Sequence, residues 1–142
     1  MLTIVPKEGM FSFMKQPVLL CYNLDTETAR KVRLCAMRFQ VRFCPVAPDQ
    51  YGQSIGSLCG LSPVEEKPVS GVAFSDPMLV MAFFPDQLMS LFLQALRKAA
   101  VPPIALKAML TDTNAAWDSF TLHQELCRER DAMQAGASAV HS

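Results

Sequence analysis

The stretch MLVMAFFPDQLMSLFLQALRKAAVPPIALKAML, residues 78–110, decides the fold class because it encodes a strand, a helix and a strand in that order. Its first seven residues form an apolar run that predicts a strand buried on both faces. Pro85 suits the first helical position and Asp86 the positive end of a helix, so we expect a helix from there to about Ala100. Two prolines then end the helix, and residues 104–110 predict the next strand.

The preceding part of the chain repeats this plan. It predicts a strand at 18–22, a helix at 26–39 capped by Asp25, a strand at 41–46 and a short helix that starts near Tyr51 and carries Gly52, Gly56 and Gly60 on one face. After residue 110, a turn at 111–114 leads into a last helix at about 115–133. Alternating strands and helices indicate an α/β fold.

We therefore expect one four-stranded sheet built from two β-α-β-α units and packed with helices. The units occupy 17–60 and 78–134 of a single domain with an internal duplication, and a crossing loop at 61–77 joins them. Residues 1–16 form an N-terminal extension and 135–142 a disordered tail. The spacing leaves the orientation of the units open. The sheet is parallel if both run the same way, and if a two-fold relates them it is mixed or antiparallel with the strand order of a ferredoxin-like α+β sandwich.

Composition narrows the function classes. Thirteen basic and thirteen acidic side chains cancel, so the chain has no global charge that favours nucleic acid or an anionic membrane. Five cysteines without a C-x-x-C pair predict free thiols in a reducing compartment, and no signal peptide or membrane span is visible, so we expect a cytoplasmic protein. A local basic patch, whose role the pattern leaves open, is typical of a solvated helix face: Arg30, Lys31, Arg33, Arg38.

Catalytic patterns are weak. Residues 52–56 satisfy the G-x-S-x-G pattern of hydrolases, and Asp112 and His123 follow Ser54 in triad order. The chain is short for that fold and several loop residues separate the strand from Gly52, so a hydrolase using Ser54 is kept only as the alternative. The two histidines, His123 and His141, form no metal constellation, and no phosphate loop exists, so no metal or cofactor is assigned.

The loops after the second strand of each unit are the expected place for a ligand. Open α/β sheets bind ligands beyond the carboxyl ends of their strands, and helix N-termini favour anions. The alternative is that Asp49 and Asn114 only cap helices and form turns. The predicted contacts for a small polar or anionic ligand are Asp49, Tyr51, Gln53, Asp112, Asn114 and Trp117.

The helix at 86–100 is apolar almost all round, which predicts burial on two sides. We expect a homodimer formed partly through Met89, Leu93 and Ala100. The favoured function is a non-enzymatic binding or self-associating scaffold domain.

Three motifs occur in order along the chain: YGQxxG at 51–56, MLVM at 78–81 followed by DQL at 86–88, and LKAxLTxTNxxW at 106–117. Together they resemble a bacterial family of domains that is catalogued only as uncharacterised. The resemblance covers about residues 18–129. It implies a single-domain bacterial protein and brings no catalytic residues with it.

Overall fold

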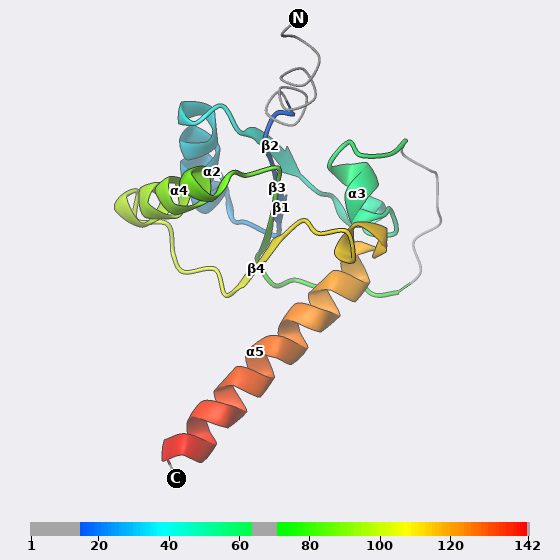
Figure 1. Ribbon diagram of the computed structural model, residues 1–142, viewed down its shortest axis with the longest axis vertical. Coiled ribbons are helices and arrows are strands. Elements are labelled where there is room, and N and C mark those ends of the chain that lie inside the picture. Colours follow the sequence, from blue (N-terminus) through cyan, green and yellow to red (C-terminus); the bar gives the residue numbers. More distant parts are fainter. Residues whose placement is uncertain (1–14, 64–70, 142) are drawn as a thin grey trace, which may run out of the picture.

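The computed structural model describes residues 15–63 and 71–141, which form one sheet flanked by helices (Figure 1). The strands are β1 (Val18–Tyr22), β2 (Arg42–Pro45), β3 (Met78–Ala82) and β4 (Leu106–Met109), in the order β2-β1-β3-β4. β1 pairs with β2 and β3 with β4 in parallel, whereas β1 and β3 are antiparallel. The expected α/β fold is confirmed, with a mixed sheet.

The orientation that the sequence left open is thereby decided. Leu20 pairs with Val80 at the middle of the β1–β3 register, and these residues occupy the same place in their strands. The two halves consequently run in opposite directions. The crossover helices α2 (Thr26–Arg38) and α4 (Asp86–Lys98) each join neighbouring strands, so the split crossovers of the ferredoxin-like alternative are not found.

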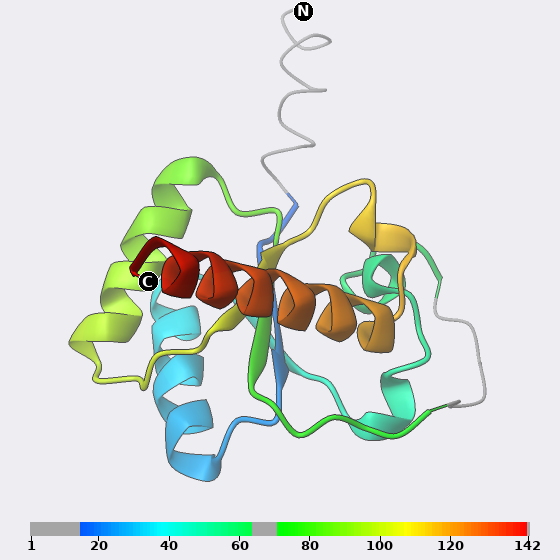
Figure 2. The same ribbon diagram turned by 90° about the horizontal axis from the view of Figure 1, so that it is seen from below.

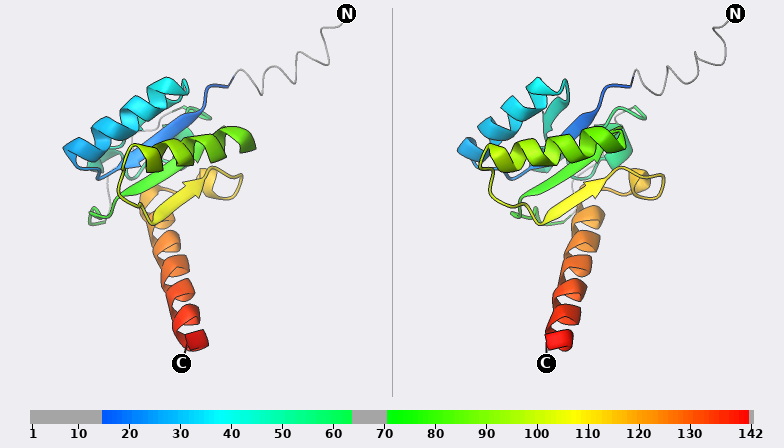
Figure 3. Two further views of the ribbon diagram at one scale, coloured as in Figure 1. Left: turned by 90° about the vertical axis from the view of Figure 1, so that its left-hand side faces the viewer. Right: turned by 60° about the vertical axis from the view of Figure 1, so that its left-hand side comes forward.

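The sheet lies between two layers of helix, because its central strands are apolar on both faces. Helices α2 and α4 lie side by side on one face (Figure 3). The 3-10 helices η1 (Pro48–Gln50) and η2 (Asn114–Ala116), helix α3 (Ile55–Leu58) and the start of α5 (Ser119–His141) cover the other. Alternate strand residues enter the two cores: Leu19, Cys21, Leu79 and Met81 face α2 and α4, and Val18, Leu20, Tyr22, Met78, Val80 and Ala82 face the opposite layer.

The backbone repeats its unusual conformations in both halves. Asn23 and Phe83 follow the first strands with φ of 58° and 64°, and Gln40 and Ala100 follow the crossover helices with φ of 59° and 62°. Left-handed residues after a helix allow the chain to turn back, and here they lead into the second strand of each half. Each half therefore makes the same two left-handed turns, and all four are at residues other than glycine.

Two expected helices differ from the prediction. The short helix begins at Ile55 and not near Tyr51, so it has one turn and the proposed face of three glycines does not form. Gly56 makes a close approach, since a Cβ there would lie 3.1 Å from the carbonyl oxygen of Ala115. The last helix continues to His141, where the sequence predicted an end at Met133 and a disordered tail from 135.

Helix α5 leaves the body of the domain (Figures 1 and 3), and seen from below it crosses in front of the sheet (Figure 2). Its first turns pack on the sheet through Leu122, Leu126 and Cys127, and residues 131–136 are exposed. Among the described residues, no helix is long and apolar enough to span a membrane. The extension expected at 1–16 lies largely outside the described residues, as does part of the crossing loop.

Candidate functional site

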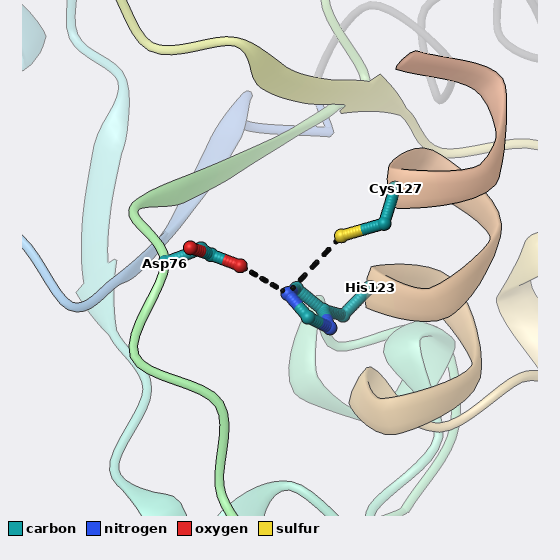
Figure 4. A group of neighbouring side chains, drawn as sticks. All are labelled: Asp76, His123 and Cys127. Carbon is teal, nitrogen blue, oxygen red and sulfur yellow. Dashed lines mark hydrogen bonds and ion pairs between the residues drawn. The ribbon is translucent and has the colours of Figure 1, made fainter. Parts of the chain in front are cut away.

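Three potential metal ligands meet where the segment before β3 passes the first turns of α5. Asp76 comes from that segment, and His123 and Cys127 project from α5 one turn apart (Figure 4). The Nε2 atom of His123 lies 2.8 Å from a carboxylate oxygen of Asp76 and 3.4 Å from the sulfur of Cys127. All three ligand atoms lie within 4.8 Å of one another. They therefore surround one point in space.

The spacing of His123 and Cys127 follows from helical geometry. Residues four apart lie on the same face, one turn above the other. The helix start that presents them is fixed by its own cap, because the Asp118 carboxylate accepts a hydrogen bond of 2.8 Å from the backbone N–H of Thr121. Buried Leu122 on the same helix anchors the turn in the core.

Aromatic stacking fixes the imidazole ring. Phe74 stacks on His123 with ring centroids 3.9 Å apart and planes inclined by 5°. Tyr51 stacks on Phe74 at 4.6 Å. The ring of His123 is thus the outer member of a stack that reaches the buried Tyr51. Such packing limits the rotamers of the histidine and pre-organises Nε2 toward its two neighbours.

The segment that carries Asp76 is held by Asn23. Its side-chain amide donates hydrogen bonds of 2.9 and 3.0 Å to the carbonyl oxygens of Phe74 and Asp76. Its amide oxygen in turn accepts a bond from the Tyr51 hydroxyl at 3.3 Å. Asn23 follows β1 in the left-handed conformation, which asparagine tolerates, and from there its side chain reaches both Tyr51 and the segment that carries Asp76.

The arrangement differs from a catalytic relay. In a triad the acid bonds one ring nitrogen of histidine and the nucleophile bonds the other. Here the carboxylate of Asp76 and the sulfur of Cys127 both approach Nε2. One proton on Nε2 can be shared between them but cannot give each a full hydrogen bond. A cation at their common centre would satisfy all three groups.

The separation of the nitrogen and sulfur atoms fits a small transition-metal ion, and the carboxylate would have to shift to complete the site. Zn²⁺ takes histidine nitrogen, cysteine sulfur and carboxylate oxygen in tetrahedral sites, where N and S ligands are about 3.6 Å apart and N and O ligands about 3.4 Å. The observed N–S separation of 3.4 Å is close to this value. The Asp76 carboxylate would move outward by about 0.6 Å, and its side chain, 48% exposed, has room to do so. The His123 side chain is 19% exposed, so the cluster opens to solvent on the Asp76 side.

Three of the other thiols are poor competitors for a metal. Burial raises the pKa of Cys59 to about 12, with a further contribution from Cys44. Burial also raises the pKa of Cys21 and Cys35 above the ordinary thiol value. Because the thiolate is the form that binds metals, these buried groups remain protonated and inert near neutral pH.

The residues of the hydrolase pattern are not brought together. The Ser54 hydroxyl caps α3 by accepting a bond of 3.1 Å from the Ser57 backbone N–H. Asp112 lines a separate hollow with Leu61 and Met109. Within the described residues, His123 bonds Asp76 and Cys127 and neither of the two expected partners.

The two predicted ligand loops leave the sheet at opposite ends and then turn back over the same face. There Ser54 and Asp118 form an antiparallel bridge. The backbone N–H of Ile55 donates to the Trp117 carbonyl at 2.8 Å, and that of Ser119 donates to the Tyr51 carbonyl at 3.0 Å. The halves therefore meet through main-chain atoms.

The six predicted ligand side chains do not share one hollow. Asn114 and Trp117 line a hollow of about 390 Å³ beside α5. Both atoms of the Asn114 amide are already bonded, to the Thr111 N–H and the Met109 carbonyl, which is the turn-forming role. Tyr51 and Gln53 are buried, and Asp49 is exposed on η1.

The expected interface and basic patch also have internal neighbours. Met89 and Leu93 pack partly against the core, because α4 has the sheet beneath it and α2 beside it, while Ala100 is exposed. In the basic patch, Arg30 pairs with Glu27 at 2.9 Å and Lys31 donates to the Ala100 carbonyl. Arg33 contacts Met37, and Arg38 lies over the Phe39 ring.

Comparison with known proteins reaches one family. Residues 77–133 match a family described as a domain of unknown function, DUF3783. The match spans β3 to α5 and includes His123 and Cys127, and it agrees with the expectation of an uncharacterised family. No curated protein and no solved structure matches the chain.

Sequence reasoning missed two members of the cluster. The four-residue spacing of His123 and Cys127 on a predicted helix was a readable signal, but the sequence analysis placed His123 only in the hydrolase pattern and assigned no metal site. Asp76 gave no signal, because it lies in an irregular loop 47 positions before His123. Only the packing of that loop against α5 brings the third ligand into place.

Proposed function

We propose that this protein is a non-enzymatic binding domain whose ligand is a divalent transition-metal ion, Zn²⁺ above all. The observation that carries the proposal is the convergence of Asp76, His123 and Cys127 on one point. Imidazole, thiolate and carboxylate are together the donor set of zinc sites. Three protein ligands leave a fourth position for water or a further donor.

Metal binding would join two parts of the chain that lie far apart in the sequence. Asp76 belongs to the segment entering β3, and the other two ligands belong to α5. Zinc binding deprotonates the cysteine and requires a neutral histidine, so affinity rises with pH. A ligand that binds only the folded state stabilises it, by about 2.7 kcal/mol at a hundredfold excess over Kd.

The test uses the untagged full chain, reduced and stripped of metal. Cobalt is the probe, because Co²⁺ bound by a thiolate gives a charge-transfer band and a four-coordinate visible spectrum. We expect both signals at one equivalent, their loss on adding Zn²⁺, and a higher melting temperature with Zn²⁺. A chain without a thiolate–cobalt band, or with no melting shift, would contradict the proposal.

Matched variants separate the site from other thiols and acids. Cys127→Ser should remove the cobalt charge-transfer band, and His123→Gln and Asp76→Asn should weaken Zn²⁺ binding at least tenfold. Cys44→Ser and Asp112→Asn change a partly exposed cysteine and an acid outside the cluster, so they should bind as the natural chain does. Equal loss in the controls would place the metal elsewhere.

Self-association is the second part of the proposal. Exposed apolar side chains on the neighbouring helices α2 and α4 support it: Leu34 and Met37 on α2, and Leu91 on α4. The expected contacts on α4 remain Met89, Leu93 and Ala100. Light scattering after size exclusion should give twice the monomer mass of 15.7 kDa. A strict monomer at micromolar concentration would contradict the homodimer.

We also propose a bacterial, cytoplasmic protein whose two halves arose by internal duplication. The odd number of free thiols supports a reducing compartment, which would also keep Cys127 available to a metal. The repeated order of elements in the two halves supports the duplication.

A further inference from the structure

A hollow of about 220 Å³ lies on the sheet face opposite the metal ligands, beside the C-terminal half of α4. Its floor consists of Leu79 from β3 and of Leu93 and Leu96 from α4. Residues 101–104, which connect α4 to β4, form its wall. Leu79, Leu96 and Ile104 are buried, so the hollow is cut into the core itself.

Most of the segment that forms the wall has no counterpart in the first half. Each element up to Val41 has its counterpart 60 positions later, and the N–H groups of Val41 and Val101 both bond back to the crossover helix, at Ala36 and Leu96. β2 then begins at Arg42, whereas β4 begins only at Leu106. The second half therefore carries four additional residues, 102–105, and the first three of these line the hollow.

The additional residues make the wall stiff. Pro102 and Pro103 have fixed φ angles, so the wall keeps its shape without a ligand. A site that is already formed loses little entropy when a ligand binds. Ile104 then returns the chain to the core as a buried side chain.

The charged side chains that line the hollow are all positive. Arg97 on the last turn of α4 and Lys107 on β4 line it, and its lining includes no acidic side chain. Both residues are exposed, so their charged ends lie at the solvent side of an apolar floor. Within the described residues Arg97 makes no ion pair, while Lys107 donates to the Ile104 carbonyl. An apolar floor below two cations suits a ligand with an apolar body and an anionic head.

We propose that this hollow binds a small amphipathic carboxylate, such as a medium-length acyl chain, with its chain on the leucine floor and its head between Arg97 and Lys107. The volume equals on the order of seven water molecules, which is room for one short chain or one ring. This site is separate from the metal ligands, which lie on the opposite face of the sheet.

The experiment titrates the ¹⁵N-labelled full chain with sodium octanoate and follows amide shifts. We expect saturable changes confined to the neighbourhood of Leu79 and to about residues 93–107. From butanoate to octanoate the affinity should rise about fourfold with each methylene buried, and it should level off when the chain exceeds the hollow. Octanol and octylammonium should bind at least tenfold more weakly than octanoate.

Two variants and a control test the assignment. Arg97→Met installs the residue that the first half has at this position, Met37, and should weaken octanoate at least tenfold. Leu93→Trp should fill the floor and abolish binding, and Arg38→Met is the matched control that should change nothing. Equal binding of octanol, shifts spread over the whole surface, or an unchanged Kd in Arg97→Met would overturn the proposal. The chain-length series on the natural protein decides the question if Leu93→Trp does not fold.

Discussion

The first half of the molecule, 18–60, and the second, 78–133, have the same order of elements but differ in the features that could bind a ligand. Both run strand, crossover helix, strand, 3-10 helix and helix, and both turn at left-handed residues in the same places. The first half ends in the single turn of α3, whereas the second ends in the long α5 that carries His123 and Cys127. Only the second half has the additional residues at 102–105.

The features that stabilise the fold differ from the features that could bind a ligand. The features common to both halves are the buried strands, the crossover helices and their left-handed exits. The features in which they differ supply His123 and Cys127, two of the three potential metal ligands, and the wall of the apolar hollow. Two of the four predictions below test the contacts between the halves, and the other two test whether equivalent features of the halves are energetically alike.

The largest effect is expected where the halves meet at the centre of the sheet. Leu20 is 1% exposed and pairs with Val80. Leu20→Ala should lower the free energy of unfolding by about 2–5 kcal/mol, because it removes buried carbon and leaves a cavity. Urea unfolding measures the change. Leu34→Ala, at a position 49% exposed, is the control and should cost less than about 0.5 kcal/mol.

The second contact between the halves is the approach of α3 to η2. A valine at Gly56 would press on the backbone of Ala115, so Gly56→Val should destabilise by about 1–3 kcal/mol. Gly136→Val is the matched control, since a Cβ at Gly136 meets nothing within 4 Å. If both variants unfold at the same urea concentration, the close approach of the halves is not a source of stability.

The caps of the two crossover helices should respond differently to acid. The Thr28 backbone N–H donates to the Asp25 carboxylate at 2.8 Å and lowers the pKa of that acid, whereas Pro85 makes no side-chain cap bond. A depressed folded-state pKa gives stability that is present above the unfolded value of about 4. That stability is lost as the pH falls through the folded-state pKa.

The Asp25→Ala variant should therefore be less stable than the natural chain at pH 7, by less than the loss in Gly56→Val. The gap should close on acidification below about pH 4, as followed by thermal unfolding across the pH range. The corresponding difference for Pro85→Ala should not vary with pH. A gap for Asp25→Ala that stays constant down to pH 2 would show that the carboxylate does not act as a cap.

The smallest effect is expected at the exits of the crossover helices. Alanine at φ of 62° is strained, and glycine is not. Ala100→Gly should raise the free energy of unfolding by about 0.5 kcal/mol, because relief of strain exceeds the added chain entropy. Gln40→Gly should give a similar gain if the two exits are equivalent. A loss of stability in one and a gain in the other would break the comparison.

The sequence predicted the fold more fully than the site, and particular residues show why. The strands at 18–22 and 78–84 and the helices at 26–39 and 86–100 were readable from local patterns, and they agree with β1, β3, α2 and α4 within two residues at every end. The start of α3 was misplaced, because Ser54 caps it through a local bond that competes with the pattern read from the glycines. Helix α5 is longer than predicted because its residues 131–136 are exposed, do not pack on the core and so carry no periodic pattern of apolar residues.

The binding residues of the loops were harder to predict, because several of the polar and aromatic side chains there make contacts within the protein and are not available to a ligand. Tyr51 was expected to contact a ligand, but it stacks on Phe74, which in turn stacks on the His123 ring. Asn114, expected at the same ligand, closes a turn. Ser54 and Asp112 were grouped by order along the chain, which does not encode distance.

The sequence by itself determined the order and type of the elements, since hydrophobic period, caps and prolines act over a few residues. Only the tertiary structure decided that β1 and β3 run antiparallel, and that the loop at 71–77 lies against α5. Those choices depend on which apolar faces pack together across the whole domain, a balance that no local pattern records. The meeting of Asp76, His123 and Cys127 is a product of that balance.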